Sequence, residues 1–212
     1  MQYSWLNKKD NKNLIVFFNG WGMNETPVKH LVCNNFDVLM LYDYRKFDIN
    51  FKDFNFEKYE KKYLISWSMG VYAVNFYKEI FEKFDRKIAI NGTGLIIDNN
   101  FGIPEKIYKL TLDYLNEENL ERFKNNMFNK GNLNPEITIT RSIEELKEEL
   151  ISIQKLKPDS EISYNKVIIS NNDKIIPSKN QINYWNTRAD YNLVNSTHCL
   201  FKEYLSWQEI IC

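Results

Sequence analysis

A serine between an apolar run and a helical pattern is the residue of this sequence best placed for chemistry. The run Tyr63–Trp67 leads into the string SWSMG at 66–70, and apolar residues then recur at helical spacing. A sharp strand-to-helix turn exposes the hydroxyl of its central serine, and the free N–H groups of the first helical turn point to the same place. The pattern predicts Ser68 as the nucleophile of an acyl transfer, with the N–H of Met69 stabilising the oxyanion. A serine that only caps the helix is the alternative.

The string departs from the usual nucleophile pattern G-x-S-x-G only at its first position. Gly70 matches the second small position, where the strand and helix backbones pass closely, and Ser66 replaces the first glycine. Serine is a small residue, so we expect the turn to form.

A glycine-rich loop follows the first apolar run, in the string FNGWG at 18–22. Hydrolases of this kind place a second oxyanion donor on such a loop, and Gly20 and Gly22 permit the backbone conformations that it needs. We predict the N–H of Trp21 as the partner of the Met69 N–H, with the indole as a wall of the acyl pocket. The alternative is a tight turn in which the indole only packs. A dinucleotide-binding loop is disfavoured, because the third glycine of G-x-G-x-x-G is missing.

The candidate base and acid follow two late apolar runs. His198 comes after the last run and Asp173 after the run before it. The order Ser68, Asp173, His198 is the chain order of α/β-hydrolase triads, and we predict His198 as the base that Asp173 orients. The alternatives are Asp98 as the acid and a turn-capping role for Asp173. His30 precedes the nucleophile, and we expect it to be solvated or packed.

The elements that must position these residues are short runs that are apolar on both faces, as the strands of a buried parallel sheet are. They are Leu14–Asn19, Phe36–Tyr42, Tyr63–Trp67, Lys87–Ile90, Val167–Ser170 and Tyr191–Val194. Helical signals alternate with them: an N-cap and a proline at Thr26 and Pro27, helical spacing over Met69–Phe84, and a C-terminal helix over Glu203–Ile211. This alternation predicts an α/β fold with a mostly parallel, doubly wound sheet.

The segment from about 99 to 158 carries no convincing strand pattern. Helical patterns cover Glu117–Phe128 and follow Ser142, which opens a capping box. The apolar face of the second helix comprises Leu146, Leu150 and Ile153. We predict a single α/β-hydrolase domain over 1–212, in which this segment is a helical insertion that caps the active site. Ordinary crossover helices are the alternative.

The composition of the chain limits the classes of partner and the cellular compartment that we expect. The chain has 28 Lys and Arg residues against 28 Asp and Glu residues, and this balance argues against nucleic acid as the main partner. Its cysteines, Cys33, Cys199 and Cys212, lack metal-ligand spacing, and Cys199 is expected to be a packed thiol. The sequence shows no signal-peptide pattern and no transmembrane run. We therefore expect a cytoplasmic protein with no metal site and no membrane contact.

Four strings together resemble one family: FFNGWG at 17–22, YDY at 42–44, SWSMG at 66–70 and INGT at 90–93. In this order, over nearly the whole chain, they are similar to the BioG-type pimeloyl-[acyl-carrier protein] methyl ester esterases of the α/β-hydrolase superfamily. The resemblance implies a serine carboxylesterase that needs no cofactor. Its implied reaction is hydrolysis of the methyl ester of pimeloyl-[acyl-carrier protein] in biotin synthesis, with release of methanol.

The resemblance also implies roles and a partner. Ser68 would be the nucleophile, Asp173 the acid, His198 the base and Trp21 an oxyanion donor, although the regions of the acid and the base match by position and order rather than by a distinctive string. The implied partner is the acyl carrier protein that carries the substrate.

Two other functions fit the same residues. A carboxylesterase or thioesterase for another small acyl substrate needs the same triad, and a non-catalytic hydrolase-like binding protein keeps the fold alone. An acidic carrier protein would need a basic docking patch, and the candidates in the insertion are Arg122, Lys124, Lys130 and Arg141. The insertion also carries many acidic residues, so a solvated helix face is the alternative.

Overall fold

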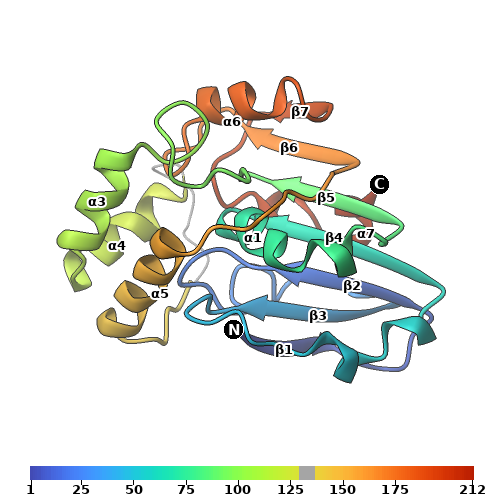
Figure 1. Cartoon of the computed structure of the whole chain (residues 1–212). Helices are drawn as coiled ribbons and strands as arrows, with labels where there is room; N and C mark the ends of the chain where they lie inside the picture. The colour runs from blue at the N-terminus through green and yellow to red at the C-terminus, as the bar shows by residue number, and fades with distance from the viewer. Residues whose placement is uncertain (129–136) are drawn as a thin grey trace.

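A seven-stranded sheet with the order β1-β3-β2-β4-β5-β6-β7 forms the centre of the protein (Figure 1). The structure is a computed structural model that describes residues 1–128 and 137–212. β1 is antiparallel to β3, and the other neighbouring strands are parallel. The strands are β1 (Gln2–Asn7), β2 (Asn13–Phe18), β3 (Phe36–Tyr42), β4 (Lys61–Trp67), β5 (Arg86–Ile90), β6 (Lys166–Ser170) and β7 (Tyr191–Val194). The predicted mostly parallel, doubly wound sheet is confirmed, and each predicted run falls in a strand of its own, except that Asn19 lies just beyond the end of β2.

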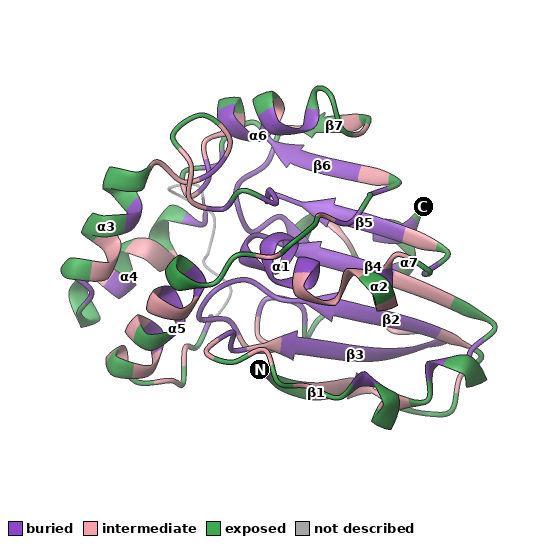
Figure 2. Cartoon of the chain, in the orientation of Figure 1, coloured by how far each residue is buried: buried purple, intermediate pink, exposed green. Residues whose placement is uncertain are grey.

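The strand β2 shows why the central runs are apolar on both faces. Leu14–Phe18 are fully buried, because elements pack on both sides of the sheet (Figure 2). Leu14, Val16 and Phe18 enter one apolar cluster, whereas Ile15 and Phe17 enter the other. The edge strand β1 is exposed or half-buried along its length, so its sequence lacks such a run and does not predict a strand.

The chain after β4 contains two short helices where the sequence predicts one long helix. α1 (Met69–Ala73) and α2 (Lys78–Phe81) are separated by a 3-10 turn at Val74–Tyr77. Tyr77 has φ −128° and ψ 27°, outside the helical range, and the ring of Phe76 stacks on Phe47 from a distant loop at 4.0 Å. Aromatic packing against the rest of the fold therefore overrides the local helical pattern.

The helix predicted to begin at Thr26 does not form. The described residues that follow Thr26 make turns, and the N–H and hydroxyl of Thr26 both donate to Oδ1 of Asn24. At the other end of the chain, the predicted C-terminal helix is shorter than expected. It is the helix α7 (Trp207–Ile211), whose N-cap is Ser206. Another helix, α6 (Ser178–Trp185), precedes β7.

The segment between β5 and β6 contains α3 (Glu105–Asp113), α4 (Glu117–Asn126) and α5 (Ile143–Lys155). These helices lie beyond the carboxyl ends of the strands (Figure 1). The predicted capping box of α5 is confirmed, because the hydroxyl of Ser142 accepts from the Glu145 N–H and the Glu145 carboxylate accepts from the Ser142 N–H. Its predicted apolar face is buried as expected at Leu146, Leu150 and Ile153. No described helix is both long and apolar enough to cross a membrane.

A buried group of charges joins α5 to the loop after β3. Arg141 pairs with Glu149 at 2.6 Å and with Asp43 at 3.1 Å. Glu149 is fully buried, and its second oxygen accepts from the Tyr44 N–H at 2.8 Å. Burial raises the pKa of Glu149, and the positive charge of Arg141 opposes that rise. The group holds α5 against the sheet at a defined position.

This arrangement corrects one expectation for carrier docking. Arg141 points into the protein rather than outward, since its side chain is only 12% exposed. Lys124 pairs with Glu121, and Lys130 lies outside the described residues. Of the four predicted docking residues, Arg122 has a well-exposed side chain (69%), paired with Glu118.

We predict that Arg141→Met destabilises the protein by about 3–5 kcal/mol, because it leaves the fully buried carboxylate of Glu149 without its cationic partner, whereas Asp43 keeps its ion pair with Arg45. Arg122→Met is the matched control: it removes an exposed ion pair within one helix and should change stability by less than about 0.5 kcal/mol. Urea unfolding of the two variants measures the difference. Equal losses in both variants would mean that the buried charges do not hold α5.

Candidate active site

The turn between β4 and α1 places Ser68 in a conformation that few residues adopt. Ser68 has φ 56° and ψ −122°, as expected for a serine on a strained strand-to-helix elbow. A Cβ at Gly70 would lie 2.2 Å from the carbonyl oxygen of Phe18, so only glycine lets the helix pass this close to β2. The sequence string is therefore folded as a nucleophile elbow, with Ser66 fully buried at its first position.

Ser68 is connected to two distant residues by a chain of hydrogen bonds. His198 Nε2 lies 2.8 Å from Ser68 Oγ, and His198 Nδ1 lies 2.8 Å from Asp173 Oδ2. All three residues are buried. An ionised carboxylate only accepts hydrogen bonds, so Nδ1 carries the proton and Nε2 is free to accept from the serine hydroxyl. This is the tautomer that a general base needs.

The carboxylate of Asp173 is held on both oxygens. Oδ1 accepts from the N–H groups of Ile175 at 2.8 Å and Ile176 at 3.0 Å, and Oδ2 accepts from Gln181 Nε2 at 2.8 Å. Gln181 lies on α6 and is fully buried. Sequence reasoning missed Gln181, because a single glutamine in a helix gives no signal that its amide reaches an acid. These contacts fix the carboxylate that orients His198.

The alternative residues lie elsewhere. Asp98 Oδ1 accepts from the N–H groups of Asn100 and Phe101 and so caps a turn. His30 lies in an exposed turn and contacts the carbonyl oxygen of Phe201. Cys199 is buried, and burial raises the pKa of its thiol to about 12, so the thiol stays neutral and packed as expected. The structure brings Asp173 and His198, not these residues, to Ser68.

The two residues predicted to supply the oxyanion donors, Trp21 and Met69, line the same cavity as Ser68. Met69 is the first residue of α1, so its N–H has no acceptor within the helix. Trp21 lies in the loop after β2, and its N–H finds no acceptor among the residues that the structure describes. The Trp21 indole donates to the carbonyl oxygen of Leu146 on α5 at 3.1 Å. This bond ties the loop to the helical insertion.

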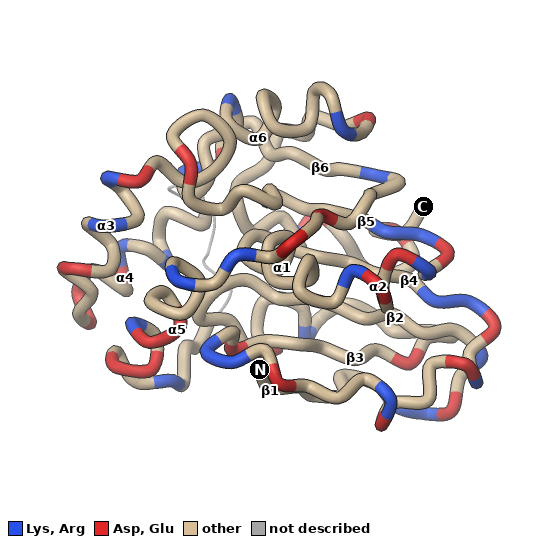
Figure 3. Tube along the Cα trace, viewed as in Figure 1, with Lys and Arg blue, Asp and Glu red and all other residues tan. Residues whose placement is uncertain are grey.

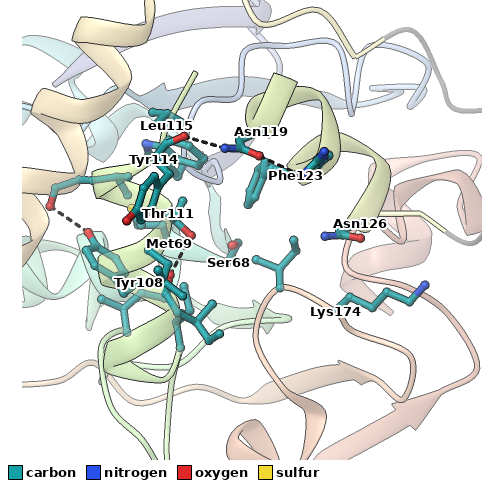
Figure 4. A pocket seen from close by; sticks show the side chains of 18 residues that line it. Ser68, Met69, Tyr108, Thr111, Tyr114, Leu115, Asn119, Phe123, Asn126 and Lys174 are labelled. Atoms are coloured by element: carbon teal, nitrogen blue, oxygen red, sulfur yellow. Dashed lines mark hydrogen bonds between the residues drawn. The ribbon is translucent and has the colours of Figure 1, made fainter. Parts of the chain in front are cut away.

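A cavity of about 330 Å³ opens at Ser68 and Met69. Its walls are mainly apolar and come from the insertion and nearby loops, among them Trp21, Ile96, Ile103, Tyr108, Leu115, Phe123, Leu150 and Ile175. Polar lining residues include Asn119, Arg122, Asn126 and Lys174. Figure 4 shows Ser68 in the middle of this lining, with Lys174 on the opposite side from Asn119. An apolar acyl chain can occupy such a cavity with its carbonyl carbon at the serine.

The arrangement of these side chains is compatible with acyl transfer. Among residues 1–128 and 137–212, no cluster of His, Cys, Asp and Glu could hold a metal ion. The serine, the imidazole and the carboxylate are joined by hydrogen bonds in the order that a nucleophile, a base and an orienting acid require.

Comparisons with known proteins agree with this geometry. Residues 1–210 match the family model described as Pimeloyl-ACP methyl esterase BioG. The crystal structure of BioG from Haemophilus influenzae superposes with a TM-score of 0.88 and 28% identity and covers 100% of both chains. An enol-lactonase from Burkholderia xenovorans LB400 has a TM-score of 0.64 at 12% identity, covering 93% of this chain and 89% of its own. Together these similarities confirm the predicted α/β-hydrolase fold.

One relative is a longer protein with a different name. The malonyl-[acyl-carrier protein] O-methyltransferase of Bacteroides fragilis (strain 638R) is 40% identical over 181 residues. The match covers 82% of this chain but only 36% of the methyltransferase. The chain thus spans about a third of that relative.

We predict that Asp173→Asn lowers the rate of ester hydrolysis by about 10³–10⁴-fold, because a neutral amide stabilises the wrong tautomer of His198 and cannot stabilise the imidazolium. Steady-state hydrolysis of a small chromogenic ester measures this loss. Asp98→Asn is the control and should retain the rate. If the loss appears in the Asp98 variant instead, the acid has been assigned to the wrong loop.

Proposed function

The chain belongs to the BioG family of pimeloyl-ACP methyl esterases, and from this premise we propose that it is a serine carboxylesterase of the cytoplasm. Its proposed substrate is the methyl ester of pimeloyl-[acyl-carrier protein], and its proposed role is in biotin synthesis. The observation that carries the proposal is the unbroken pair of 2.8 Å hydrogen bonds from Asp173 through His198 to Ser68. This series of hydrogen bonds ends at Ser68, which lines a mainly apolar cavity suited to an acyl group.

The first half of the reaction forms an acyl-enzyme. His198 Nε2 takes the proton of the Ser68 hydroxyl while Oγ attacks the ester carbonyl carbon. The N–H groups of Trp21 and Met69 donate hydrogen bonds to the carbonyl oxygen and stabilise the negative charge that develops on it. The imidazolium then gives its proton to the methoxy oxygen, the bond between carbon and that oxygen breaks, and methanol leaves.

The second half releases the acid. A water molecule gives a proton to His198 Nε2 and attacks the acyl carbon, and the same N–H groups stabilise the second oxyanion. The proton returns from His198 to Ser68 Oγ as the acyl bond breaks. The products are the free carboxyl end of the pimeloyl chain and the regenerated serine. Asp173 stays ionised and holds the imidazole throughout.

The cavity suits a chain that enters with its ester leading. The helices α3, α4 and α5 supply much of its apolar lining, including Tyr108, Phe123 and Leu150. We therefore treat this insertion as a cap that binds the methylene chain of the substrate. Burial of each methylene group stabilises the complex by about 0.8 kcal/mol.

Two basic residues line the cavity, and we propose that they contact the acidic carrier protein. Arg122 from α4 and Lys174 from the loop after β6 both line it, and both residues are exposed. Elsewhere on the insertion, basic and acidic residues are mixed (Figure 3). The proposed docking residues are therefore Arg122, from the sequence prediction, and Lys174, which the fold adds.

We predict that Ser68→Ala abolishes ester hydrolysis and labelling by a fluorophosphonate, with an unchanged fold. The alanine keeps the packing of the elbow but has no oxygen to acylate. His198→Ala should lose a similar factor, because the two residues act as a unit. His30→Ala is the matched control and should retain activity. Activity of Ser68→Ala within about tenfold of the wild type would contradict the serine mechanism.

We predict that methyl pimeloyl-[acyl-carrier protein] is cleaved with a higher kcat/KM than a free methyl ester of pimelate. Carrier contacts add binding energy that positions the ester. The double variant Arg122→Glu and Lys174→Glu should reduce kcat/KM by about tenfold for the carrier-bound ester only. Added salt should likewise lower kcat/KM of the wild type for the carrier-bound ester.

The control for charge reversal is Lys52→Glu with Lys83→Glu. These two lysines precede β4 and β5, both are exposed, and neither lines the cavity. Equal efficiency on free and carrier-bound esters would favour a general carboxylesterase or thioesterase for small acyl groups.

A further inference from the structure

Asn91 is a buried polar residue that the serine mechanism leaves without a role. It follows β5, within the string INGT at 90–93, and it is fully buried. Its φ of 45° lies in the left-handed region, where asparagine and glycine are the residues most easily accommodated. A residue of this kind at the carboxyl edge of the sheet must satisfy its amide inside the protein.

The amide of Asn91 is fully used. Its Oδ1 accepts from the Ser170 N–H at 2.7 Å. Its Nδ2 lies 2.9 Å from Ser170 Oγ, 3.2 Å from the Thr197 carbonyl oxygen and 2.9 Å from the His198 carbonyl oxygen. One side chain therefore joins the end of β6, which leads to the loop of Asp173, to the loop that carries His198.

The same stretch of backbone also contacts the nucleophile. The carbonyl oxygen of Ile90 accepts from the Ser68 N–H at 2.9 Å. A Cβ at Gly92 would lie 2.4 Å from the Ser68 carbonyl oxygen. Residues 90–92 thus contact the Ser68 turn directly, while Asn91 reaches the other two segments.

The loop of His198 depends on such side-chain contacts. His198 lies in neither a helix nor a strand. Its carbonyl oxygen accepts from Asn91 Nδ2 and from the indole N–H of Trp67, each at 2.9 Å. The imidazole can remain within hydrogen-bond distance of Ser68 only if this backbone stays in place.

We propose that Asn91 is a positioning residue that sets His198 relative to Ser68 and Asp173. The proposal rests on the serine mechanism proposed above. Asn91 does not touch the reacting atoms, and it acts through the main chain of the His198 loop. A displacement of the imidazole by about 1 Å lowers the rate of such a reaction by about 10²-fold. A purely structural asparagine would change stability and leave the turnover unchanged.

The test variant is Asn91→Gly. Glycine adopts the same positive φ and removes every amide contact. Asn91→Asp is the second variant, which keeps the shape and the acceptor for the Ser170 N–H but replaces the donor toward His198. The matched control is Asn180→Ala, because the buried Asn180 amide also donates to two backbone carbonyl groups, those of Asn99 and Gly102, neither of which belongs to a site residue.

Two measurements report on the position of the His198 imidazole. In steady-state ester hydrolysis, we expect kcat to fall by about 30- to 100-fold in both Asn91 variants, with KM within about twofold of the wild type. In a His30→Gln background, His198 is the one remaining histidine of the two in the chain, so its Nδ1–H resonance is read without overlap. We expect that resonance to shift or to disappear in both Asn91 variants and to stay in place in Asn180→Ala.

The outcomes separate the proposal from the mechanism on which it rests. Folded Asn91→Gly or Asn91→Asp protein with kcat within about twofold of the wild type and an unshifted resonance overturns the positioning role. The same effects in Asn180→Ala overturn it too, since they would reflect general loosening. Ser68→Ala is measured alongside. If that variant still hydrolyses the ester, the serine mechanism fails, and the resonance alone decides whether Asn91 positions His198.

Discussion

The hydrogen bond between Ser68 and His198 joins residues that are 130 positions apart in the chain. It can form only because β4, β6 and β7 run parallel and deliver their following loops to one edge of the sheet. The strained φ of Ser68 and the buried carboxylate of Asp173 are both tolerated because that edge is held tightly. The parallel sheet is therefore the constraint on which the geometry of the site depends.

Around this bond, buried polar groups are satisfied in a way that leaves little freedom. Asp173 accepts hydrogen bonds from two backbone N–H groups, from Gln181 and from His198. The His198 carbonyl oxygen accepts from two side chains, one of which is Asn91. Each lost partner would leave a buried group unpaired, at a cost of about 1–3 kcal/mol. The same contacts that stabilise the edge of the sheet therefore also orient the imidazole.

The sequence by itself determined the local part of this protein. The apolar runs predict six of the strands that the structure contains, because burial on both faces is recorded in consecutive residues. The elbow around Ser68 and the capping box at Ser142 are equally local, since each depends on residues within a few positions. Chain order then singled out Asp173 and His198, which the structure does bring to Ser68. The alternation of apolar runs with helical patterns also indicated the fold class, because this alternation too is recorded along the chain.

Only the tertiary structure decided which distant residues support the site. Arg141 reads as a surface charge in the sequence, yet it pairs with buried carboxylates on two elements. The helix expected over Met69–Phe84 is interrupted, because a ring from a distant loop stacks on Phe76. No sequence pattern around Gln181 or Asn91 predicts their hydrogen-bond partners. The physical reason is common to all four: these contacts form between segments that are adjacent only after folding, so no periodicity or spacing within the chain records them.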